Sequence, residues 1–359
     1  MAGAFAALAT AAPPLTTYPP SPEDRPAAKE ALATARVALF AGRTDQAYRL
    51  LLTAQPDLGQ TPEFLELAAR VYLALDRPLR MADCYLALSK KDASAAQKVR
   101  AVLTRQGGGA PRTFLAGPSS RWPGFDRERL KDVVAVAPGP SGTVFLLRGT
   151  GLEHVDSDGR SLGLTAFSGG LDLTVDFEGR PVALGEGKVL WGDRAVPLPA
   201  SMDKPASAAV SPGGSLFILD RGSRRLLRLD SVGAVSGVTA VPLQDPVKVR
   251  VDPAGRIYIA DRDTSRVEVF GPDMAPVKSV SPEAAQHAVR RIEDMSVDFA
   301  GDVMLLDGKA HQLLLFSPDG RFLGTSADRI PRVDAAGWDG LGVLVYVAEK
   351  EGTLGKAGT

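Results

Sequence analysis

The chain has 359 residues, with 42 Lys and Arg against 42 Asp and Glu, and therefore no formal net charge. A balanced charge gives no general attraction to nucleic acid or to an anionic membrane surface, so nucleic acid is not an expected partner. The single cysteine, Cys84, excludes an intrachain disulfide and a cysteine-based metal cluster. Its apolar helical surroundings predict a small buried side chain.

Residues 1–24 form an Ala- and Pro-rich tail. The small residues of "ALATA" are typical of a signal-peptide cleavage site, although a basic start and a Leu-rich stretch are lacking. Two interpretations stay open. The tail is the remnant of an export signal, which places the protein in the periplasm or outside the cell, or it is an extended terminus of a cytoplasmic protein. No later stretch is long and apolar enough to predict a transmembrane segment.

Residues 25–106 carry apolar side chains three and four positions apart, which predicts helices. Five helices are expected. The first ends near Gly42 and the second near Pro56, and the third begins with Thr61 as N-cap and Pro62 in its first position. The segment is therefore expected to be an α-helical N-terminal domain.

Two pairs of helices repeat in this segment, because Gly42 and Asp76 occupy equivalent turns 34 residues apart. With "FAGRTDQAYRLLLTAQP", which supplies Gly42, Ala47 and Pro56, the segment resembles the tetratricopeptide repeat. The second pair departs from that pattern at Asp76 and Met81, and unrelated helical hairpins are the alternative. Two pairs and one helix are fewer than the roughly three repeats of a stable stack. The segment should therefore dock on the rest of the chain or on a partner protein.

Residues 107–128 form a Gly-rich linker, and residues 129–359 lose the helical period. Short β-rich runs alternate there with Gly, Pro and Asp turns and fall into six copies. The glycine before the second strand of each copy recurs at spacings of 37, 35, 41, 46 and 39 residues: Gly142, Gly179, Gly214, Gly255, Gly301 and Gly340. A period near 40 residues with three or four strands per copy is typical of a β-propeller.

The fourth copy, "VKVRVDPAGRIYIADRDTSRVEVFGPDM", resembles the NHL repeat. It contains an apolar strand, Asp, a Gly turn, a second apolar strand, Asp, a polar loop with Arg, and a strand ending in Phe. The third and fifth copies share this frame, whereas the other three lack the second Asp. The resemblance implies a mainly β chain with a six-bladed, NHL-like β-propeller over residues 129–359.

The second aspartate of the frame follows an apolar strand and precedes a polar turn at Asp220, Asp261 and Asp307. A carboxylate at such a corner can accept hydrogen bonds from turn N–H groups. A residue used once per blade is more economically a structural device than a catalyst. We therefore predict that these three aspartates are structural blade-turn residues.

A basic residue comes directly after each of these aspartates: Arg221, Arg262 and Lys309. The three should recur on one side of the propeller, where they would form a basic rim that binds an acidic partner or peptide. Scattered, solvated charges are the alternative interpretation.

The sixth copy is short and lacks a full outer strand, which would leave an exposed strand edge. The segment "RTFLAG", residues 112–117, precedes the first blade and is predicted to close the ring by pairing beside the last blade. The alternative is a C-terminal strand in "GTLGKA", residues 352–357.

No residue can be singled out as catalytic, cofactor-binding or metal-binding. The three histidines, His154, His287 and His311, occupy different kinds of position, which makes a poor set of metal ligands. The chain is also poor in Asn, which argues against a calcium site. No phosphate-binding or dinucleotide-binding glycine loop occurs in the sequence. The favoured hypothesis is a non-enzymatic protein–protein interaction scaffold, an assembly component of a bacterial envelope or multiprotein complex. The alternative is a propeller-type lyase or hydrolase with its site at the channel mouth.

Overall fold

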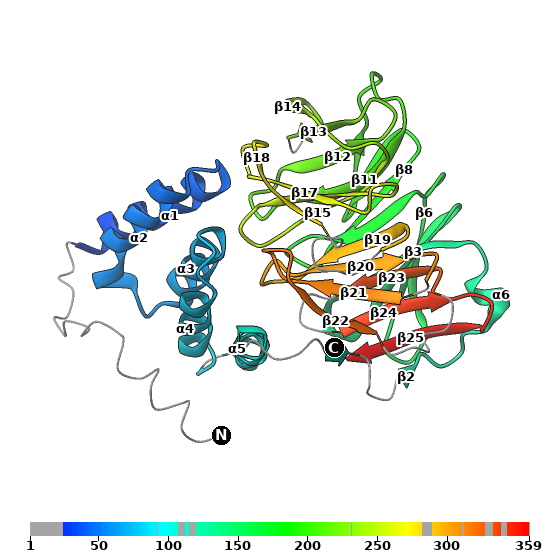
Figure 1. The fold of residues 1–359 in the computed structure, drawn as a ribbon, viewed down its shortest axis with the longest axis horizontal. Helices are drawn as coiled ribbons and strands as arrows, with labels where there is room; N and C mark the ends of the chain where they lie inside the picture. Colours follow the sequence, from blue (N-terminus) through cyan, green and yellow to red (C-terminus); the bar gives the residue numbers. More distant parts are fainter. Residues whose placement is uncertain are drawn as a thin grey trace.

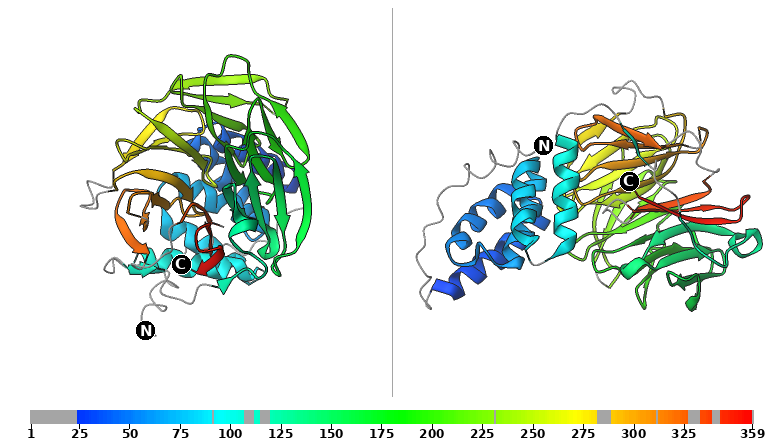
Figure 2. Two further views of the ribbon diagram at one scale, coloured as in Figure 1. Left: turned by 90° about the vertical axis from the view of Figure 1, so that its right-hand side faces the viewer. Right: turned by 90° about the horizontal axis from the view of Figure 1, so that it is seen from below.

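A helical arm lies beside a ring of β-sheets in the computed structural model (Figure 1, Figure 2). The structure describes residues 24–90, 92–106, 112–114, 120–230, 232–281, 289–310, 312–326, 333–338 and 343–358. No helix within these ranges combines the length and the apolar character needed to cross a membrane.

The predicted helical segment is present as α1 (Asp24–Phe40), α2 (Thr44–Leu58), α3 (Pro62–Ala74), α4 (Pro78–Leu88) and α5 (Ala93–Gln106). Thr61 caps α3, because its Oγ1 accepts a hydrogen bond from the backbone N–H of Phe64 at 3.3 Å. Cys84 is buried in α4, and burial raises the pKa of its thiol to about 12. The similarity of the arm to the tetratricopeptide repeat stays a prediction.

The two equivalent inter-helix turns share a left-handed backbone, with φ of +76° at Gly42 and +51° at Asp76. Glycine adopts this conformation freely, whereas an L side chain such as that of Asp76 does so at a cost. The Asp76 carboxylate lies 2.9 Å from Arg256 Nη1 and 3.5 Å from Lys278 Nζ, both in the propeller. The departure from glycine thus coincides with an ion pair that joins the arm to the ring.

Six antiparallel sheets form the blades, which confirms the six-bladed prediction. The strands of the first three blades are β3 (Val133–Pro138), β4 (Val144–Arg148), β5 (Gly151–Val155) and β6 (Ser161–Ala166); β7 (Asp172–Val175), β8 (Pro181–Gly185), β9 (Lys188–Trp191) and β10 (Arg194–Pro197); and β11 (Pro205–Val210), β12 (Leu216–Asp220), β13 (Arg225–Leu229) and β14 (Val235–Ala240).

The strands of the last three blades are β15 (Pro246–Val251), β16 (Ile257–Asp261), β17 (Val267–Phe270) and β18 (Pro276–Val280); β19 (Ile292–Val297), β20 (Val303–Asp307), β21 (Gln312–Phe316) and β22 (Phe322–Ser326); and β23 (Ala335–Trp338), β24 (Val343–Ala348) and β25 (Thr353–Gly358). A short helix, α6 (Arg127–Leu130), precedes the first blade. In that blade, a 3-10 turn (Pro140–Gly142) joins β3 to β4. The first strand of each blade lies innermost, next to the first strands of its two neighbours.

Hydrophobic clusters fill the spaces between neighbouring blades, one cluster for each of the six interfaces. Phe217 and Ile257, for example, join the third blade to the fourth. Val136 and Val345 join the first blade to the sixth, so the ring is closed by the same kind of contact. Each blade therefore hides its apolar faces only through its neighbours.

The glycine that sets the sequence period ends the turn between the first two strands of a blade. Its φ lies between +78° and +85° in the five described copies: Gly142, Gly179, Gly214, Gly255 and Gly301. Gly340 lies outside the described residues. In the fourth blade, Asp252 Oδ1 accepts hydrogen bonds from the backbone N–H groups of Ala254 and Arg256, each at 2.9 Å. The period thus marks a turn that needs a left-handed residue.

The prediction that residues 112–117 pair beside the last blade is wrong. β1 (Arg112–Phe114) pairs in parallel with β22 and becomes a fifth strand of the fifth blade; residues 115–117 lie outside the described residues. The physical reason is the position of α5. Its Val102 lines a cavity together with Ser317 and Arg321 of the turn that leads into β22, so α5 lies close to the outer strand of the fifth blade.

The last blade is completed by β2 (Ser120–Arg121), which pairs antiparallel with β25. The alternative segment, residues 352–357, falls in β25, the third strand of that blade. Next to β2, the backbone N–H of Trp122 donates to the Leu354 carbonyl at 2.9 Å, and the Trp122 ring packs between the sixth and first blades. A segment that precedes the first blade thus closes the ring.

The arm docks on the face of the ring that carries the turns between the first and second strands. Ala254 and Phe299, from turns of the fourth and fifth blades, belong to the hydrophobic core of the arm itself. Tyr85 of α4 packs edge-to-face on Phe299, with ring centroids 5.8 Å apart. The expected docking surface of the arm therefore includes the propeller of the same chain.

Replacing Phe299 with Ala should weaken this docking, because a Phe that is 7% exposed loses its contacts with the arm. We expect a loss of about 3–5 kcal/mol in the free energy of unfolding, measured with urea. Phe177 is the matched control: it occupies the same turn of the second blade, in Asp-Phe-Glu-Gly against Asp-Phe-Ala-Gly, but is 42% exposed. Phe177→Ala should cost less than about 1 kcal/mol. Equal losses would show that the arm does not depend on Phe299.

Candidate functional site

A charged cluster fills the centre of the channel that the innermost strands enclose. Asp172 (β7) accepts hydrogen bonds from Lys248 Nζ at 2.7 Å and Arg250 Nη1 at 3.0 Å, both on β15. Asp294 (β19) lies 3.4 Å from Lys248 and 3.7 Å from Arg250. Ser207 (β11) donates from Oγ to Asp172 at 2.5 Å. We call these five residues the channel cluster.

The channel cluster is buried and electrically balanced, with two cations and two carboxylates. Burial alone would raise the pKa of Asp172, but the positive charges of Arg250 and Lys248 outweigh burial and hold the pKa well below its ordinary value. Burial would lower the pKa of Lys248, and the carboxylates of Asp172 and Asp294 raise it instead. Asp172, Lys248 and Arg250 are therefore charged at neutral pH.

Sequence reasoning missed this cluster, although β15 contained a signal. Lys248 and Arg250 alternate with valines in "VKVRV", and alternate residues of a strand point to the same side. Two cations two residues apart therefore lie on the same side of this innermost strand. Both cations pair with Asp172, which lies 76 residues before Lys248 and 78 residues before Arg250 in the sequence. Only the closed ring brings the three residues together.

One mouth of the channel is open and holds two of the three predicted rim residues. Arg221 Nη2 donates to Asp245 Oδ2 at 2.8 Å, and Arg262 lies 4.0 Å from Asp245 and 3.5 Å from Glu293. Both arginines line a cavity of about 480 Å³. Lys309 does not line it; its exposed side chain lies on the turn after β20. The other charged lining residues are Lys204, Lys248, Arg291, Glu293, Asp294 and Asp334.

The three predicted blade-turn aspartates all accept hydrogen bonds from backbone N–H groups. Asp261 Oδ1 accepts from Asp263 and Thr264, and its Oδ2 accepts from Gln244 and Asp245, at distances between 2.6 and 2.9 Å. Each carboxylate thus joins the turn after the second strand to the loop before the first strand of its own blade. The same arrangement recurs at Asp220, with Lys204, and at Asp307, with Arg290, Lys309 and Ala310.

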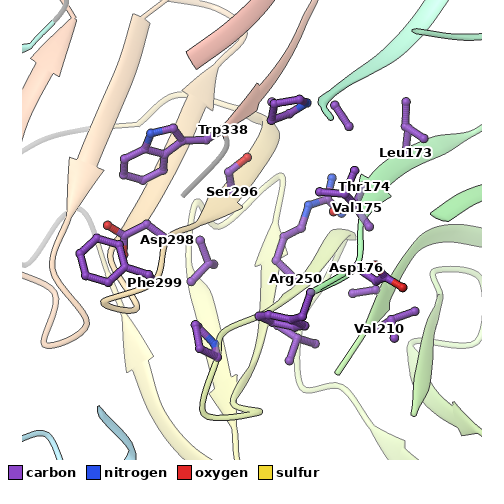
Figure 3. A pocket seen from close by; sticks show the side chains of 18 of the residues that line it. Leu173, Thr174, Val175, Asp176, Val210, Arg250, Ser296, Asp298, Phe299 and Trp338 are labelled. Atoms are coloured by element: carbon purple, nitrogen blue, oxygen red, sulfur yellow. The ribbon is translucent and has the colours of Figure 1, made fainter. Parts of the chain in front are cut away.

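The other mouth of the channel lies under the arm, where a second cavity of about 400 Å³ is lined by all six blades and by α3, α4 and α5. Figure 3 shows Trp338, Asp298 and Phe299 on one side of it and Leu173, Val175 and Asp176 on the other. Arg250 of the channel cluster lies between these two sides. The channel cluster thus separates a covered cavity from an open one.

His154 is the one histidine that falls within the described residues. Its ring stacks on Phe145, with centroids 4.3 Å apart, and its Nε2 lies 3.0 Å from Thr143 Oγ1. Burial lowers its pKa. Within the described ranges, no three His, Cys, Asp or Glu side chains are grouped so that they could hold a metal ion. The expectation of no metal and no cofactor stays a prediction.

Comparison with known families matches residues 243–270, which form most of the fourth blade, to the NHL repeat. The chain thus combines an NHL repeat with a six-bladed propeller, as the sequence predicts. No curated protein matches the chain in sequence.

Solved structures are similar to this chain at low sequence identity. A protein of unknown function from Bacteroides thetaiotaomicron is 16% identical with a TM-score of 0.52, covering 67% of this chain and 72% of that chain. A catalytically inactive virginiamycin B lyase from Staphylococcus aureus, solved with quinupristin, is 11% identical with a TM-score of 0.49, covering 63% and 80%. A protein of unknown function from Bacteroides caccae is 12% identical with a TM-score of 0.48, covering 54% and 81%.

The Asp172→Asn variant should destabilise the ring, because it leaves Lys248 and Arg250 buried without their main counter-charge. We expect a loss of about 3–5 kcal/mol in the free energy of unfolding, measured with urea. Asp158→Asn is the control, since that side chain is 68% exposed and should change stability by less than about 0.5 kcal/mol. An unchanged Asp172→Asn protein would show that the channel cluster does not hold the inner strands together.

Asp261→Asn should also destabilise the protein, since an amide keeps one acceptor oxygen where the carboxylate has two. One pair of backbone N–H groups would then face an NH₂ group, at a cost of about 2–3 kcal/mol. The exposed neighbour Asp263→Asn should cost less than about 0.5 kcal/mol. Loss of partner binding without loss of stability would contradict the structural role.

The pH dependence of stability, compared between wild type and Asp261→Asn, gives a second measurement of the role of Asp261. Burial alone would raise the pKa of Asp261, but backbone hydrogen bonds, first that of Thr264, lower it overall. The ionised carboxylate therefore contributes stability above the unfolded-state pKa of about 4, and this contribution is lost as the pH falls through the lower folded-state value. Wild type should lose more stability than Asp261→Asn when acidified below about pH 4.

Proposed function

We propose that this protein is a non-enzymatic scaffold that binds a partner protein at the open mouth of its propeller. The observation that carries the proposal is the composition of that mouth. Five cations and three carboxylates line this cavity of about 480 Å³. The cations are Lys204, Arg221, Lys248, Arg262 and Arg291, and the carboxylates are Glu293, Asp294 and Asp334. A surface of this kind suits an acidic segment of a partner.

Apolar side chains lie among these cations. Val134 is 45% exposed and Leu171 is 41% exposed, and both line the open mouth. Exposed apolar groups with a charged border are typical of protein interaction surfaces. A partner segment that alternates acidic and apolar side chains would satisfy both features of the mouth.

The arginines at the mouth are held in place before a partner arrives. Asp245 receives hydrogen bonds from both Nε and Nη2 of Arg221, and its own backbone N–H donates to Asp261. A positioned guanidinium loses little conformational freedom when it binds a carboxylate, which favours affinity. The turn aspartates thereby support the proposed binding surface indirectly.

The outer side of the arm offers a second surface for a multiprotein complex. Large apolar side chains are exposed on α1, α2 and α4: Val37 (63%), Leu52 (47%), Leu79 (49%) and Leu86 (51%). The tetratricopeptide-like character of the arm, and assembly work at a bacterial envelope after export, belong to this proposal. The export hypothesis depends only on the composition of residues 1–24.

The test is affinity capture from the native host with the full chain and two matched double variants. Arg221→Gln with Arg262→Gln should reduce recovery of the partner at least tenfold, because two of the five cations that line the mouth are lost. Arg160→Gln with Arg194→Gln should not, since these exposed arginines lie at the outer edges of the first two blades. The interaction should weaken as salt is raised.

Equal recovery with both double variants would refute the open mouth as the binding surface. Elemental analysis of the same preparations tests the lyase or hydrolase alternative. About one equivalent of bound metal per chain in the purified wild-type protein would favour the enzyme and count against the scaffold.

A further inference from the structure

The open mouth has two chemically different sides. The large exposed apolar side chains that line it, Val134 and Leu171, come from the first and second blades. All five cations that line it come from the third, fourth and fifth blades: Lys204, Arg221, Lys248, Arg262 and Arg291. In a closed ring of six, the first blade faces the fourth across the channel, and the second faces the fifth. The apolar side of the mouth therefore lies opposite a basic side.

On the basic side, three arginines share two carboxylates in one chain of ion pairs. Asp245 accepts hydrogen bonds from Nε and Nη2 of Arg221 and lies 4.0 Å from Arg262 Nη1. Glu293 accepts a hydrogen bond from Arg291 Nε and lies 3.5 Å from Arg262 Nη2. Arg221 and Arg291 thus each hold a carboxylate, and Arg262 lies between the two. We call these five residues the arginine ladder.

Arg262 is the member of the arginine ladder whose side chain makes no hydrogen bond to any described residue. Its ion-pair distances of 3.5 and 4.0 Å exceed the length of a charge-assisted hydrogen bond, which is about 2.7–2.9 Å. The side chain is 30% exposed, and its Nε is buried whereas Nη1 and Nη2 are not. These two terminal nitrogens can therefore donate to an acceptor from outside the chain.

The charges of the mouth leave room for one more carboxylate. The channel cluster at its inner end is balanced, with two cations and two carboxylates. Lys204 is exposed and forms no ion pair with a described residue. Outside the channel cluster, four cations remain against three carboxylates: Lys204, Arg221, Arg262 and Arg291 against Asp245, Glu293 and Asp334. The excess is one positive charge.

We propose that the open mouth selects a partner segment by one acidic and one large apolar side chain, bound at opposite sides. The acidic side chain accepts hydrogen bonds from Nη1 and Nη2 of Arg262, as a carboxylate does from a guanidinium. Arg221 and Arg291 offset the charges of Asp245 and Glu293, so the incoming carboxylate meets the excess positive charge. The inference rests on the proposed scaffold function and assigns the choice of partner to Arg262.

The apolar side chain of the segment packs on Val134 and Leu171, which are 45% and 41% exposed. Covering them removes apolar surface from water, and the gain grows with the area that is covered. One cavity of about 480 Å³ contains both sides, and this volume falls in the range of roughly 300–1,000 Å³ that ligand sites occupy. A short segment can therefore contact both sides at once.

The probes are N-acetylated, C-amidated peptides that join Leu and Glu in either order, with spacers of up to about three glycines to sample several separations. Binding to the full chain is measured by NMR titration. The best peptide should bind with a dissociation constant below about 5 mM. The same peptide with Gln for Glu should bind at least about tenfold more weakly, and with Ala for Leu at least about threefold. No binding by any peptide, or equal binding with Gln, would overturn the proposal.

Methyl resonances locate the bound peptide. The signals of Val134 and Leu171, assigned with the Val134→Ala and Leu171→Ala variants, should shift during the titration. Leu162 and Val277 are the matched controls, because they are 56% and 57% exposed but lie on the outer strands β6 and β18. Their signals should stay in place. Saturable binding that leaves the Val134 and Leu171 signals unmoved would count against the proposal.

The Arg262→Gln variant separates selection of the partner from folding. It should weaken binding of the best peptide at least about tenfold. Its urea midpoint should stay close to that of wild type, because the Arg262 side chain makes no hydrogen bond to a described residue. Arg262→Lys keeps the charge without the planar pair of donors and should recover part of the affinity. Arg194→Gln, at an exposed position of β10, is the control; equal peptide affinities of Arg262→Gln and Arg194→Gln would contradict the proposal.

Partner capture from the native host distinguishes this inference from the scaffold function. If recovery falls with the Arg221→Gln and Arg262→Gln double variant but persists with Arg262→Gln alone, the inference is wrong and the scaffold function stands. If the peptides bind through Arg262 but partner recovery does not depend on the mouth, the scaffold function is wrong and the chemistry assigned to the mouth stands.

Discussion

The mutual burial of neighbouring blades is the constraint on which the rest of the structure depends. A four-stranded sheet has two apolar faces, and in this ring each face is covered only by the next blade. The constraint applies equally at the junction between the sixth and first blades, where Trp122 and β2 bring a segment from before the first blade. Closure of the ring, rather than the stability of any one sheet, therefore determines where the innermost strands lie.

Closure also explains why charged residues can occupy the channel. Removing a lone Lys or Asp from water is strongly unfavourable, and a buried ion pair adds little net stability even when its geometry is good. Asp172, Ser207, Lys248, Arg250 and Asp294 come from four blades, and each needs the others. A blade in the wrong register would leave a charge unpaired. The channel cluster therefore favours one arrangement of the ring over others that would bury as much apolar surface.

The blades could be predicted from the sequence because their signals are local. A left-handed turn glycine, an aspartate that accepts hydrogen bonds from its own turn, and alternating apolar residues each act within a few positions. The channel cluster depends on residues brought together by closure, up to 78 positions apart, and no local pattern contains it. The closing strand was misassigned for a related reason: its partner depends on where α5 docks.

The arm gives two faces of a nearly symmetric ring different surroundings. The turns at Phe177 and Phe299 share one sequence frame, yet Phe299 is buried under the arm and Phe177 remains exposed. Likewise, Gly42 and Asp76 share a backbone conformation, but only Asp76 can pair with Arg256 of the propeller. Equivalent local sequences thus acquire different roles through the part of the chain they meet. The arm covers one channel mouth and leaves the other, with its positioned arginines, accessible to a protein.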